Sequence, residues 1–176
     1  MPRFRTHDIC LCFRVLFHQR HKEMNLVSNS FAEGEFIPPL YTCDGANISP
    51  PLSWSGLPKG TRSLALICDD PDAPGGDFVH WVLFNIPPEV GGVEEGQPRN
   101  GRGPGGSVQG MTDFGRPGYG GPCPPRGTHR YYFRLFALDA MLEGGTESTK
   151  SDLMYRMEGR VLARCTLMAY FKREKS

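Results

Sequence analysis

The chain has 176 residues, enough for one domain with a substantial hydrophobic core. It carries 20 Lys and Arg residues against 19 Asp and Glu residues, and the formal net charge of +1 argues against a dedicated nucleic-acid-binding protein. The 22 glycines and 16 prolines favour a fold that is rich in loops and strands.

The first 23 residues differ in character from the rest. Arg3 and Arg5 precede an apolar run, as in a secretion signal, but Arg14 interrupts the run and no small-residue cleavage site follows. The run is too short to span a bilayer, so no transmembrane segment is expected. We expect residues 1–23 to be an N-terminal extension outside the fold, and residues 24–173 to form the folded domain.

The cysteines suggest a compartment. They are Cys10, Cys12, Cys43, Cys68, Cys123 and Cys165, and no two of them form a C-x-x-C pair. This usage is typical of reduced thiols in a cytoplasmic protein, and it predicts neither a metal site nor a cofactor.

Strands dominate the predicted elements. Stretches of aliphatic and aromatic residues between turn residues predict strands over residues 26–31, 63–69, 78–86, 129–138 and 160–171. One helix is predicted over residues 150–158, with Leu153, Met154 and Met157 on its inner side and Gly159 as its stop. Residues 99–127 hold ten glycines and five prolines and predict long ordered loops. Together these features predict a mainly β fold, an antiparallel Greek-key β-sandwich with one or two short helices.

Two histidines stand near the start of predicted strands. Strict alternation places His80 on one side with Val82, Phe84 and Ile86, and His129 on one side with Tyr131, Phe133, Leu135 and Ala137. If these strands are neighbours, the two imidazoles meet over one pocket. Taken singly, each histidine is also compatible with a buried structural role.

Three carboxylates stand at the end of the strand predicted over residues 63–69 and just after it, namely Asp69, Asp70 and Asp72. A strand-end aspartate is commonly a turn-former. A carboxylate that binds one imidazole nitrogen also fixes the tautomer and leaves the other nitrogen facing a pocket. Tyr131 adds a phenolic donor, and backbone N–H groups of residues 118–122 offer a concave surface to an anion. The residues therefore predict a small phosphate or carboxylate site, with the aspartates as orienting groups.

The same residue types allow other chemistry. Asp and His side chains around one centre would bind a divalent metal and activate water. His129 would alternatively act as a base for Ser107, Thr112 or Thr128, although no G-x-S-x-G motif is present. Residues 101–106 satisfy G-x-G-x-x-G, but without the flanking strand and helix that dinucleotide binding requires.

Four stretches resemble the phosphatidylethanolamine-binding protein family, which includes the Raf kinase inhibitor proteins. They are DGANISPPLSW (44–54), DPDAP (70–74) with HWVLFNIP (80–87), TDFGRPGYGGPCPPRGTHRYYFRLFALD (112–139), and MEGRVLARCTLMAYF (157–171). The resemblance is to the short bacterial and archaeal members. It implies an anion pocket that uses Asp70, Asp72, His80, His129 and Tyr131, with Gly121, Pro122, Cys123 and Pro124 at the rim. It also implies a cis Ala73–Pro74 bond.

We therefore expect a non-enzymatic binding protein for phosphate or a phospholipid head group. The family resemblance suggests that it inhibits a protease or a kinase. The alternative is a hydrolase or lyase built on the Asp and His residues, and a homodimer is a further possibility. The sequence ends shortly after the last predicted strand, so the C-terminal helix of longer eukaryotic members is not expected, and the pocket should be more open. At Cys123 a packed, unreactive thiol is expected.

Overall fold

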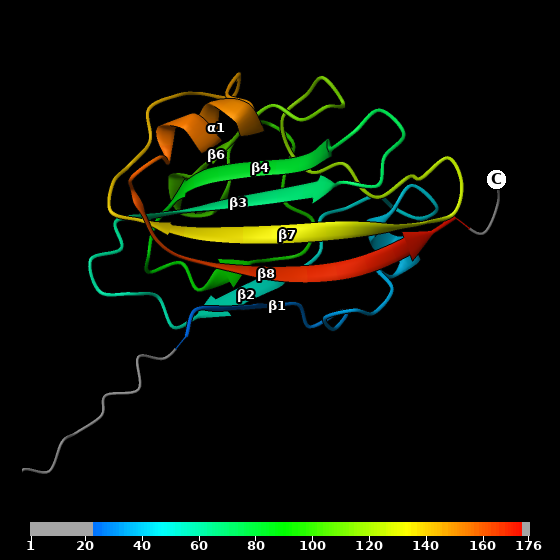
Figure 1. Cartoon of the computed structure of the whole chain (residues 1–176), viewed down its shortest axis with the longest axis horizontal. Helices are drawn as coiled ribbons and strands as arrows, with labels where there is room; N and C mark the ends of the chain where they lie inside the picture. The colour runs from blue at the N-terminus through cyan, green and yellow to red at the C-terminus, as the bar shows by residue number, and fades with distance from the viewer. Residues whose placement is uncertain (1–22, 174–176) are drawn as a thin grey trace, which may run out of the picture.

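Two antiparallel sheets form the fold in a computed structural model that describes residues 23–173 (Figure 1). The smaller sheet has the order β1-β2-β5 and the larger sheet the order β6-β4-β3-β7-β8. The strands are β1 (Asn25–Val27), β2 (Leu52–Ser55), β3 (Ser63–Asp70), β4 (Phe78–Ile86), β5 (Gly92–Val93), β6 (Val108–Gln109), β7 (Thr128–Leu138) and β8 (Val161–Lys172). One α-helix, α1 (Lys150–Arg156), and two 3-10 helices, η1 (Pro39–Tyr41) and η2 (Pro104–Gly106), complete the described elements.

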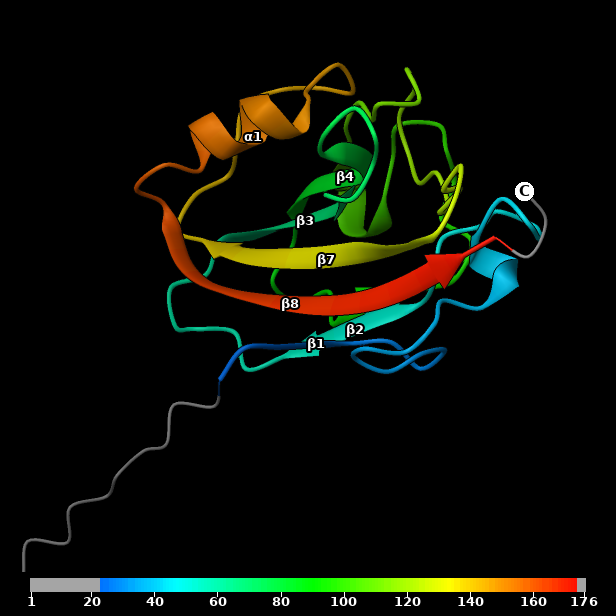
Figure 2. The same ribbon diagram turned by 45° about the vertical axis from the view of Figure 1, so that its right-hand side comes forward.

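The two sheets lie face to face, as Figure 2 shows. The core between them joins Leu26, Trp54 and Val93 of the smaller sheet to Leu66, Trp81 and Phe133 of the larger one. The predicted antiparallel β-sandwich is thereby confirmed. The apolar side chains of the core come from segments far apart in the chain. The sandwich is therefore stabilised by long-range contacts rather than by local structure.

The larger sheet also buries its second face. Every residue of β3 is buried, because α1 and the segment before it cover the side that faces away from the smaller sheet. Ile67 and Phe84 pack there against Leu142, Leu153 and Met157. The helix was predicted, but this second core was not. With it, β3 becomes the central strand of a three-layer arrangement.

Helix α1 begins at a capping box. The Thr149 side chain accepts a hydrogen bond from the backbone N–H of Asp152, and the Asp152 carboxylate accepts one from the backbone N–H of Thr149. Leu153 and Met157 face inward as predicted. The prediction for Met154 is wrong, since its side chain is 46% exposed. A residue adjacent to Leu153 is rotated about 100° around the helix, away from the sheet.

The first strand is shorter than predicted, because β1 ends at Val27. Ser28 then donates a side-chain hydrogen bond to the carbonyl oxygen of Pro51 at 2.8 Å, and the chain bends away from the sheet. The other predicted strands agree with β3, β4, β7 and β8 to within a residue. Residues 1–22 lie outside the described residues, so the extension expected over residues 1–23 stays a prediction.

Strand β4 departs from strict alternation twice. Cys68 pairs with Trp81 and Asp69 pairs with Val79, so that His80 is an extra residue in β4. A second shift separates the pairs Leu64–Ile86 and Leu66–Leu83, where Asn85 has a φ of 58°. The predicted grouping of His80 and Ile86 with Val82 and Phe84 is therefore wrong. His80 and Ile86 lie on the face toward the smaller sheet, whereas Val82 and Phe84 face α1.

The predicted face of β7 is confirmed for Tyr131, Phe133, Leu135 and Ala137, all of which lie in the core between the sheets. Replacement of the fully buried Phe133 by Ala should lower the free energy of unfolding by about 3–5 kcal/mol, because it removes apolar contacts and leaves a cavity.

Urea denaturation followed by tryptophan fluorescence measures this loss. Phe36→Ala is the matched control, because the Phe36 side chain is 57% exposed and its loss should cost below about 1 kcal/mol. Equal losses for the two variants would contradict the placement of Phe133 in the core.

Candidate functional site

A buried carboxylate–imidazole pair joins the end of β3 to the start of β7. The Nδ1–H of His129 donates to Asp70 Oδ2 at 2.7 Å, and both side chains are buried. The other Asp70 oxygen, Oδ1, accepts from the backbone N–H of Asp72 at 2.8 Å. Because the carboxylate fixes Nδ1 as the donor, the remaining nitrogen of His129, Nε2, is left for another partner.

His80 is held by the glycine-rich loop that precedes β7. Its Nδ1 lies 2.7 Å from the carbonyl oxygen of Gly120. A carbonyl oxygen only accepts, so Nδ1 carries the proton. The backbone N–H of Gly120 in turn donates to the carbonyl oxygen of His80 at 2.9 Å. The loop therefore pairs with β4 at this residue and sets the orientation of the imidazole.

A pocket of about 200 Å³ lies between these two imidazoles. Asp70, His80 and His129 supply its polar lining, and every other lining residue is apolar or a cysteine. Neither His80 nor His129 has a buried ring nitrogen without a partner, so each Nε2, which makes no hydrogen bond to the described residues, has some access to solvent. The two histidines are thus brought together as predicted, although β3 separates their strands.

Aromatic rings and prolines make up the rest of the wall. Phe78 and Phe114 contact each other and the His80 ring, with ring centroids 5.0–5.3 Å apart. The remaining lining residues are Ala73, Pro74, Cys123, Pro124 and Pro125. Three lining residues were not predicted, Phe78, Phe114 and Pro125, and their only signal was closeness in sequence to predicted site residues.

Tyr131 lies beside the pocket and does not line it. Its ring packs edge-on against the His80 ring, with centroids 5.2 Å apart, and its side chain is fully buried. Burial, together with the nearby Asp70 carboxylate, raises the pKa of Tyr131. Its hydroxyl oxygen makes no hydrogen bond to the described residues. Tyr131 therefore supports the His80 ring, and its predicted role as a donor to the ligand stays a prediction.

Asp72 also lies outside the pocket lining. Its carboxylate is bound by Arg130, with Nη2 at 2.6 Å from Oδ1 and Nε at 2.8 Å from Oδ2. The backbone N–H of Arg130 donates to the same carboxylate at 2.9 Å. These bonds hold the pKa of Asp72 at about 2, mainly through the guanidinium. Asp72 thereby anchors the segment after β3 to the start of β7.

The rim residues divide by role. Cys123 and Pro124 line the pocket, whereas Gly121 and Pro122 are buried behind it. The N–H of Gly121 donates to Asn47 Oδ1 at 2.7 Å, and the carbonyl oxygen of Pro122 accepts from the N–H of Cys43 at 3.0 Å. A side chain at Gly121 would collide with the backbone at Tyr41, which explains the glycine.

A disulfide joins Cys43 to Cys123, with the Cα atoms 5.4 Å apart. The expectation of reduced thiols, including a packed free thiol at Cys123, is wrong for this pair. Cys68 and Cys165 remain free thiols. Reduced thiols were the basis for expecting a cytoplasmic location, and the disulfide removes part of that basis, so the location stays a prediction.

The Ala73–Pro74 peptide bond is trans, so the implied cis bond is not present. Even before proline the trans form is favoured by about 0.5–1 kcal/mol. The turn is closed instead by a hydrogen bond from the N–H of Gly76 to the carbonyl oxygen of Ala73 at 3.0 Å. Ala73 and Pro74 still line the pocket.

Asp69 points away from the pocket, toward α1. It is fully buried and lies 3.0 Å from Arg134 and 2.6 Å from Lys150, which also contacts Asp77. A buried carboxylate with two cationic partners is a structural anchor, because either cation offsets the cost of burying the charge. Asp69 thus has a structural role, but as an ion-pair partner and not as the turn-former that is common at strand ends.

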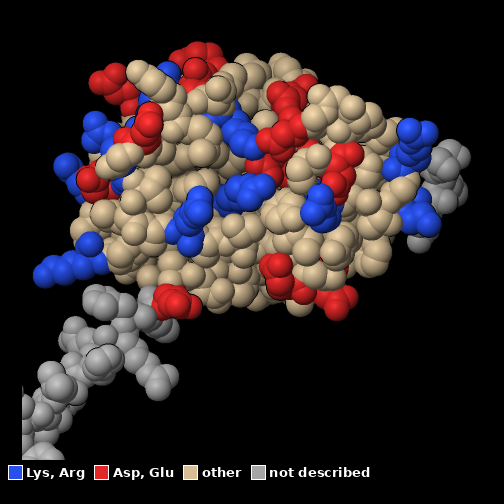
Figure 3. All heavy atoms as spheres, in the orientation of Figure 1, with Lys and Arg blue, Asp and Glu red and all other residues tan. Residues whose placement is uncertain are grey.

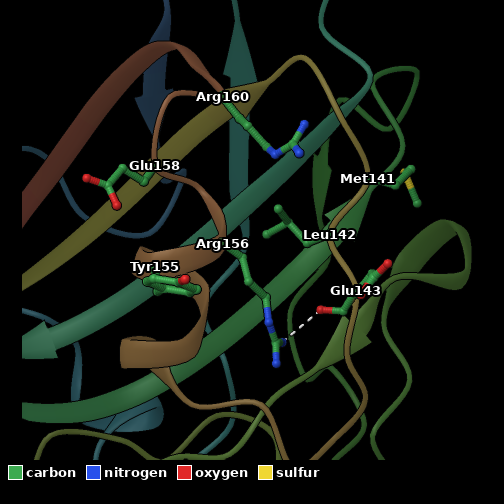
Figure 4. A pocket seen from close by; sticks show the side chains of 7 residues that line it. All are labelled: Met141, Leu142, Glu143, Tyr155, Arg156, Glu158 and Arg160. Carbon is green, nitrogen blue, oxygen red and sulfur yellow. Dashed lines mark hydrogen bonds between the residues drawn. The ribbon is translucent and has the colours of Figure 1, made fainter.

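A larger hollow of about 530 Å³ lies at the opposite end of the large sheet, between α1 and residues 141–143 (Figure 4). Arg156, Arg160, Glu143 and Glu158 are among the residues that line it. Arg156 is engaged, since it donates to the carbonyl oxygen of Glu143 at 2.7 Å. This hollow is lined by side chains of both charges, and one of its arginines is already hydrogen-bonded. The predicted site residues lie instead at the pocket between the histidines.

The surface carries both signs of charge. On the face drawn in Figure 3, Lys and Arg lie interspersed with Asp and Glu, in keeping with the net charge of +1. The expectation that the chain binds no nucleic acid stays a prediction. Within residues 23–173, no helix has the length and apolar character of a membrane span. Within the same residues, no three His, Cys, Asp or Glu side chains are grouped to hold a metal ion.

The family is shown by comparison with known proteins. The family model described as phosphatidylethanolamine-binding protein matches residues 27–172. A UPF0098 protein of Methanothermobacter thermautotrophicus is 55% identical over 150 residues, which cover 85% of this chain and 99% of that protein. A UPF0098 protein of Aquifex aeolicus is 46% identical over 154 residues, which cover 86% and 90%. The chain therefore belongs to the phosphatidylethanolamine-binding protein family.

Solved structures agree with the fold. E. coli YbcL, described as a member of the mammalian PEBP family, matches with a TM-score of 0.81 and 34% identity, over 86% of this chain and 99% of YbcL. A Chlamydia trachomatis protein named as a phosphatidylethanolamine-binding protein homolog matches with a TM-score of 0.80 and 39% identity, over the same shares.

The Asp72 carboxylate should make the free energy of unfolding depend on pH in the acidic range. Its folded-state pKa of about 2 lies below its ordinary value of 3.8, so the stabilising contribution is complete above about pH 4 and is lost as the pH falls through 2. Asp72→Asn should lower the unfolding free energy at pH 7 and flatten its decline between pH 4 and pH 2.

Urea denaturation over that pH range tests this, with the exposed Glu89→Gln as control. An unchanged acid limb in Asp72→Asn would contradict the assigned role of the Arg130 pair.

The disulfide should stabilise the fold, because it closes a sequence separation of 80 residues. Replacing Cys43 and Cys123 together by Ser should lower the unfolding free energy by about 2–4 kcal/mol. Reductant should lower the stability of the wild-type protein similarly and leave the double variant unchanged.

Peptide mapping without reductant checks the linkage directly. Recovery of the Cys43 and Cys123 peptides as separate species from the untreated protein would refute it.

Proposed function

We propose that this family member is a non-enzymatic binding protein that holds a small oxyanion, such as phosphate or the phosphate of a phospholipid head group, between His80 and His129. The observation that carries the proposal is the pair of ring nitrogens left without a partner at one pocket. Each imidazole has its Nδ1–H committed to a protein acceptor, and each Nε2 remains for a ligand.

The size and lining of the pocket support a small polar head with an apolar neighbour. A volume of about 200 Å³ is below the roughly 300–1,000 Å³ of drug-sized ligand sites, so the pocket suits one small group. Phe78, Phe114 and the rim prolines provide an apolar wall around the two imidazoles. Such a wall excludes water and strengthens hydrogen bonds to the ligand.

The lining argues against the hydrolase or lyase alternative. Within residues 23–173 no Ser, Thr or Lys lines the pocket, and Cys123 is committed to the disulfide. Thr112 donates its hydroxyl to the carbonyl oxygen of Arg116 at 2.7 Å, and Ser107 is buried outside the lining. A nucleophile beside the histidine base is thus not in place. Inhibition of a protease or kinase, and dimer formation, stay predictions.

Histidine NMR during titration with phosphate and with phosphorylethanolamine tests the proposal. The imidazole signals of His80 and His129 should shift together and saturate, because both rings face one ligand. The remaining histidines of the chain, His7, His18 and His21, serve as internal references.

A variant pair sharpens the test. His129→Gln should weaken phosphate binding at least tenfold, whereas Arg160→Gln, at the hollow beside α1, should leave it unchanged. Binding that survives His129→Gln and is lost in Arg160→Gln would move the site to the other end of the sheet and overturn the proposal.

A further inference from the structure

The two imidazoles do not present the same hydrogen-bonding character to a ligand. His80 donates from Nδ1 to a backbone carbonyl, which carries no net charge. His129 donates from Nδ1 to the Asp70 carboxylate, which is negatively charged when ionised. A carboxylate partner supports a protonated imidazole and a carbonyl does so far less. His129 is therefore suited to donate from Nε2, whereas the neutral form of His80 has a lone pair on Nε2 and accepts.

The surroundings of His80 favour the neutral form. Its side chain is almost fully buried against Phe78, Phe114 and Tyr131, and burial lowers its pKa. The charged groups that face it are Asp70 from β3 and Asp113 from the loop before β7, and both oppose this shift, as do the carbonyl groups of Gly120 and Gly121. Burial is the largest effect, so the pKa of His80 is lowered, which favours the neutral imidazole.

The described part of the chain places no permanent cation beside this acceptor. Neither Lys nor Arg of residues 23–173 lines the pocket. Arg116 lies 5.6 Å from the centre of the Phe114 ring, on which it stacks, and it is not a lining residue. Arg130 is committed to Asp72. A fully deprotonated oxyanion would therefore place a negative oxygen against the lone pair of His80, which is unfavourable.

We propose that this site selects an oxyanion that still carries one acidic proton, specifically the monoanion of a terminal phosphate monoester, over a phosphodiester. This inference rests on the proposed function and adds the ligand class. The P–OH group donates to His80 Nε2, and an unprotonated oxygen accepts from His129 Nε2. A diester anion has no P–OH group, so it binds in the same place only after His80 takes up a proton from solvent.

The proposal gives the two ligand classes different proton requirements. The second pKa of a phosphate monoester is about 6, so its monoanion is abundant at mildly acidic pH. Monoester affinity should fall above about pH 6 as the monoanion is depleted. Diester binding should be weaker and should convert His80 to the imidazolium form.

Methyl phosphate and dimethyl phosphate are the matched probes, because they differ by one methyl group. Calorimetry on the full chain at pH 6 should show methyl phosphate binding at least tenfold more tightly. Nitrogen-15 histidine spectra should show the Nδ1–H tautomer of His80 in the free protein and in the methyl phosphate complex. Equal affinities, or an imidazolium His80 in the methyl phosphate complex, would overturn the inference.

Two variants separate selection from simple binding. His80→Gln replaces the fixed acceptor by an amide that also donates, and should bring the two affinities to within about threefold. His129→Gln should weaken both probes and preserve the order between them. Preserved tenfold selection in His80→Gln would contradict the role assigned to His80, and the spectra of the wild-type protein decide the question if that variant does not fold.

The outcomes also distinguish this inference from the function beneath it. If neither probe, nor inorganic phosphate, shifts the NMR signals of the His80 and His129 imidazoles, the proposed anion site itself is wrong. If phosphate and both probes bind without discrimination, the site stands and the proton requirement fails. Vesicles that contain phosphatidic acid, compared with phosphatidylcholine vesicles, then show whether a membrane-borne monoester reaches the pocket or only a soluble one does.

Discussion

One extra residue in β4 determines where the site forms. His80 is inserted opposite the step from Cys68 to Asp69, and this bulge turns its imidazole to the face that carries Tyr131 and His129. Val82 faces α1. Without the bulge, side chains would alternate between the two faces of β4, and position 80, two residues before Val82, would face α1 as well. Because β3 lies between β4 and β7, the two rings then meet across the end of the central strand, where Asp70 supplies the partner of His129.

The aspartates after Ile67 show how one short segment serves several purposes. Asp69 faces α1 and holds Arg134 and Lys150, Asp70 faces the pocket and holds His129, and Asp72 binds Arg130 outside it. Successive side chains of a strand point to opposite faces, so adjacent carboxylates are separated into a structural ion cluster and a site residue. Only Asp70 is both close to an imidazole and part of the pocket lining.

Sequence reasoning succeeded where the chain is regular and failed where it is not. Strand β7 alternates without interruption from His129 to Ala137, so its buried face was predictable. The bulge at His80 leaves no mark in the hydrophobic pattern, and the pocket was predicted from a pairing of neighbouring strands that does not exist. The Cys43–Cys123 bond was missed because a separation of 80 residues carries no spacing signal. The rim was placed only by family resemblance, which did not separate lining residues from buried ones.

One side of the pocket is formed by the glycine-rich loop before β7, and this loop is bonded to neighbouring segments at several points. The disulfide, the Cys43–Pro122 and Gly121–Asn47 hydrogen bonds, and a bond of 2.8 Å from the Tyr119 hydroxyl to the carbonyl oxygen of Tyr41 all tie it to residues 41–47. Its pairing with His80 ties it to β4 as well. A rim held in this way does not need to be ordered by the ligand, so less binding energy is lost to ordering. It also keeps the Gly120 carbonyl fixed on His80 Nδ1, and that bond makes the other nitrogen an acceptor. The glycine-rich loop thus determines the hydrogen-bonding character of the site, although its backbone carbonyl acts only through the imidazole.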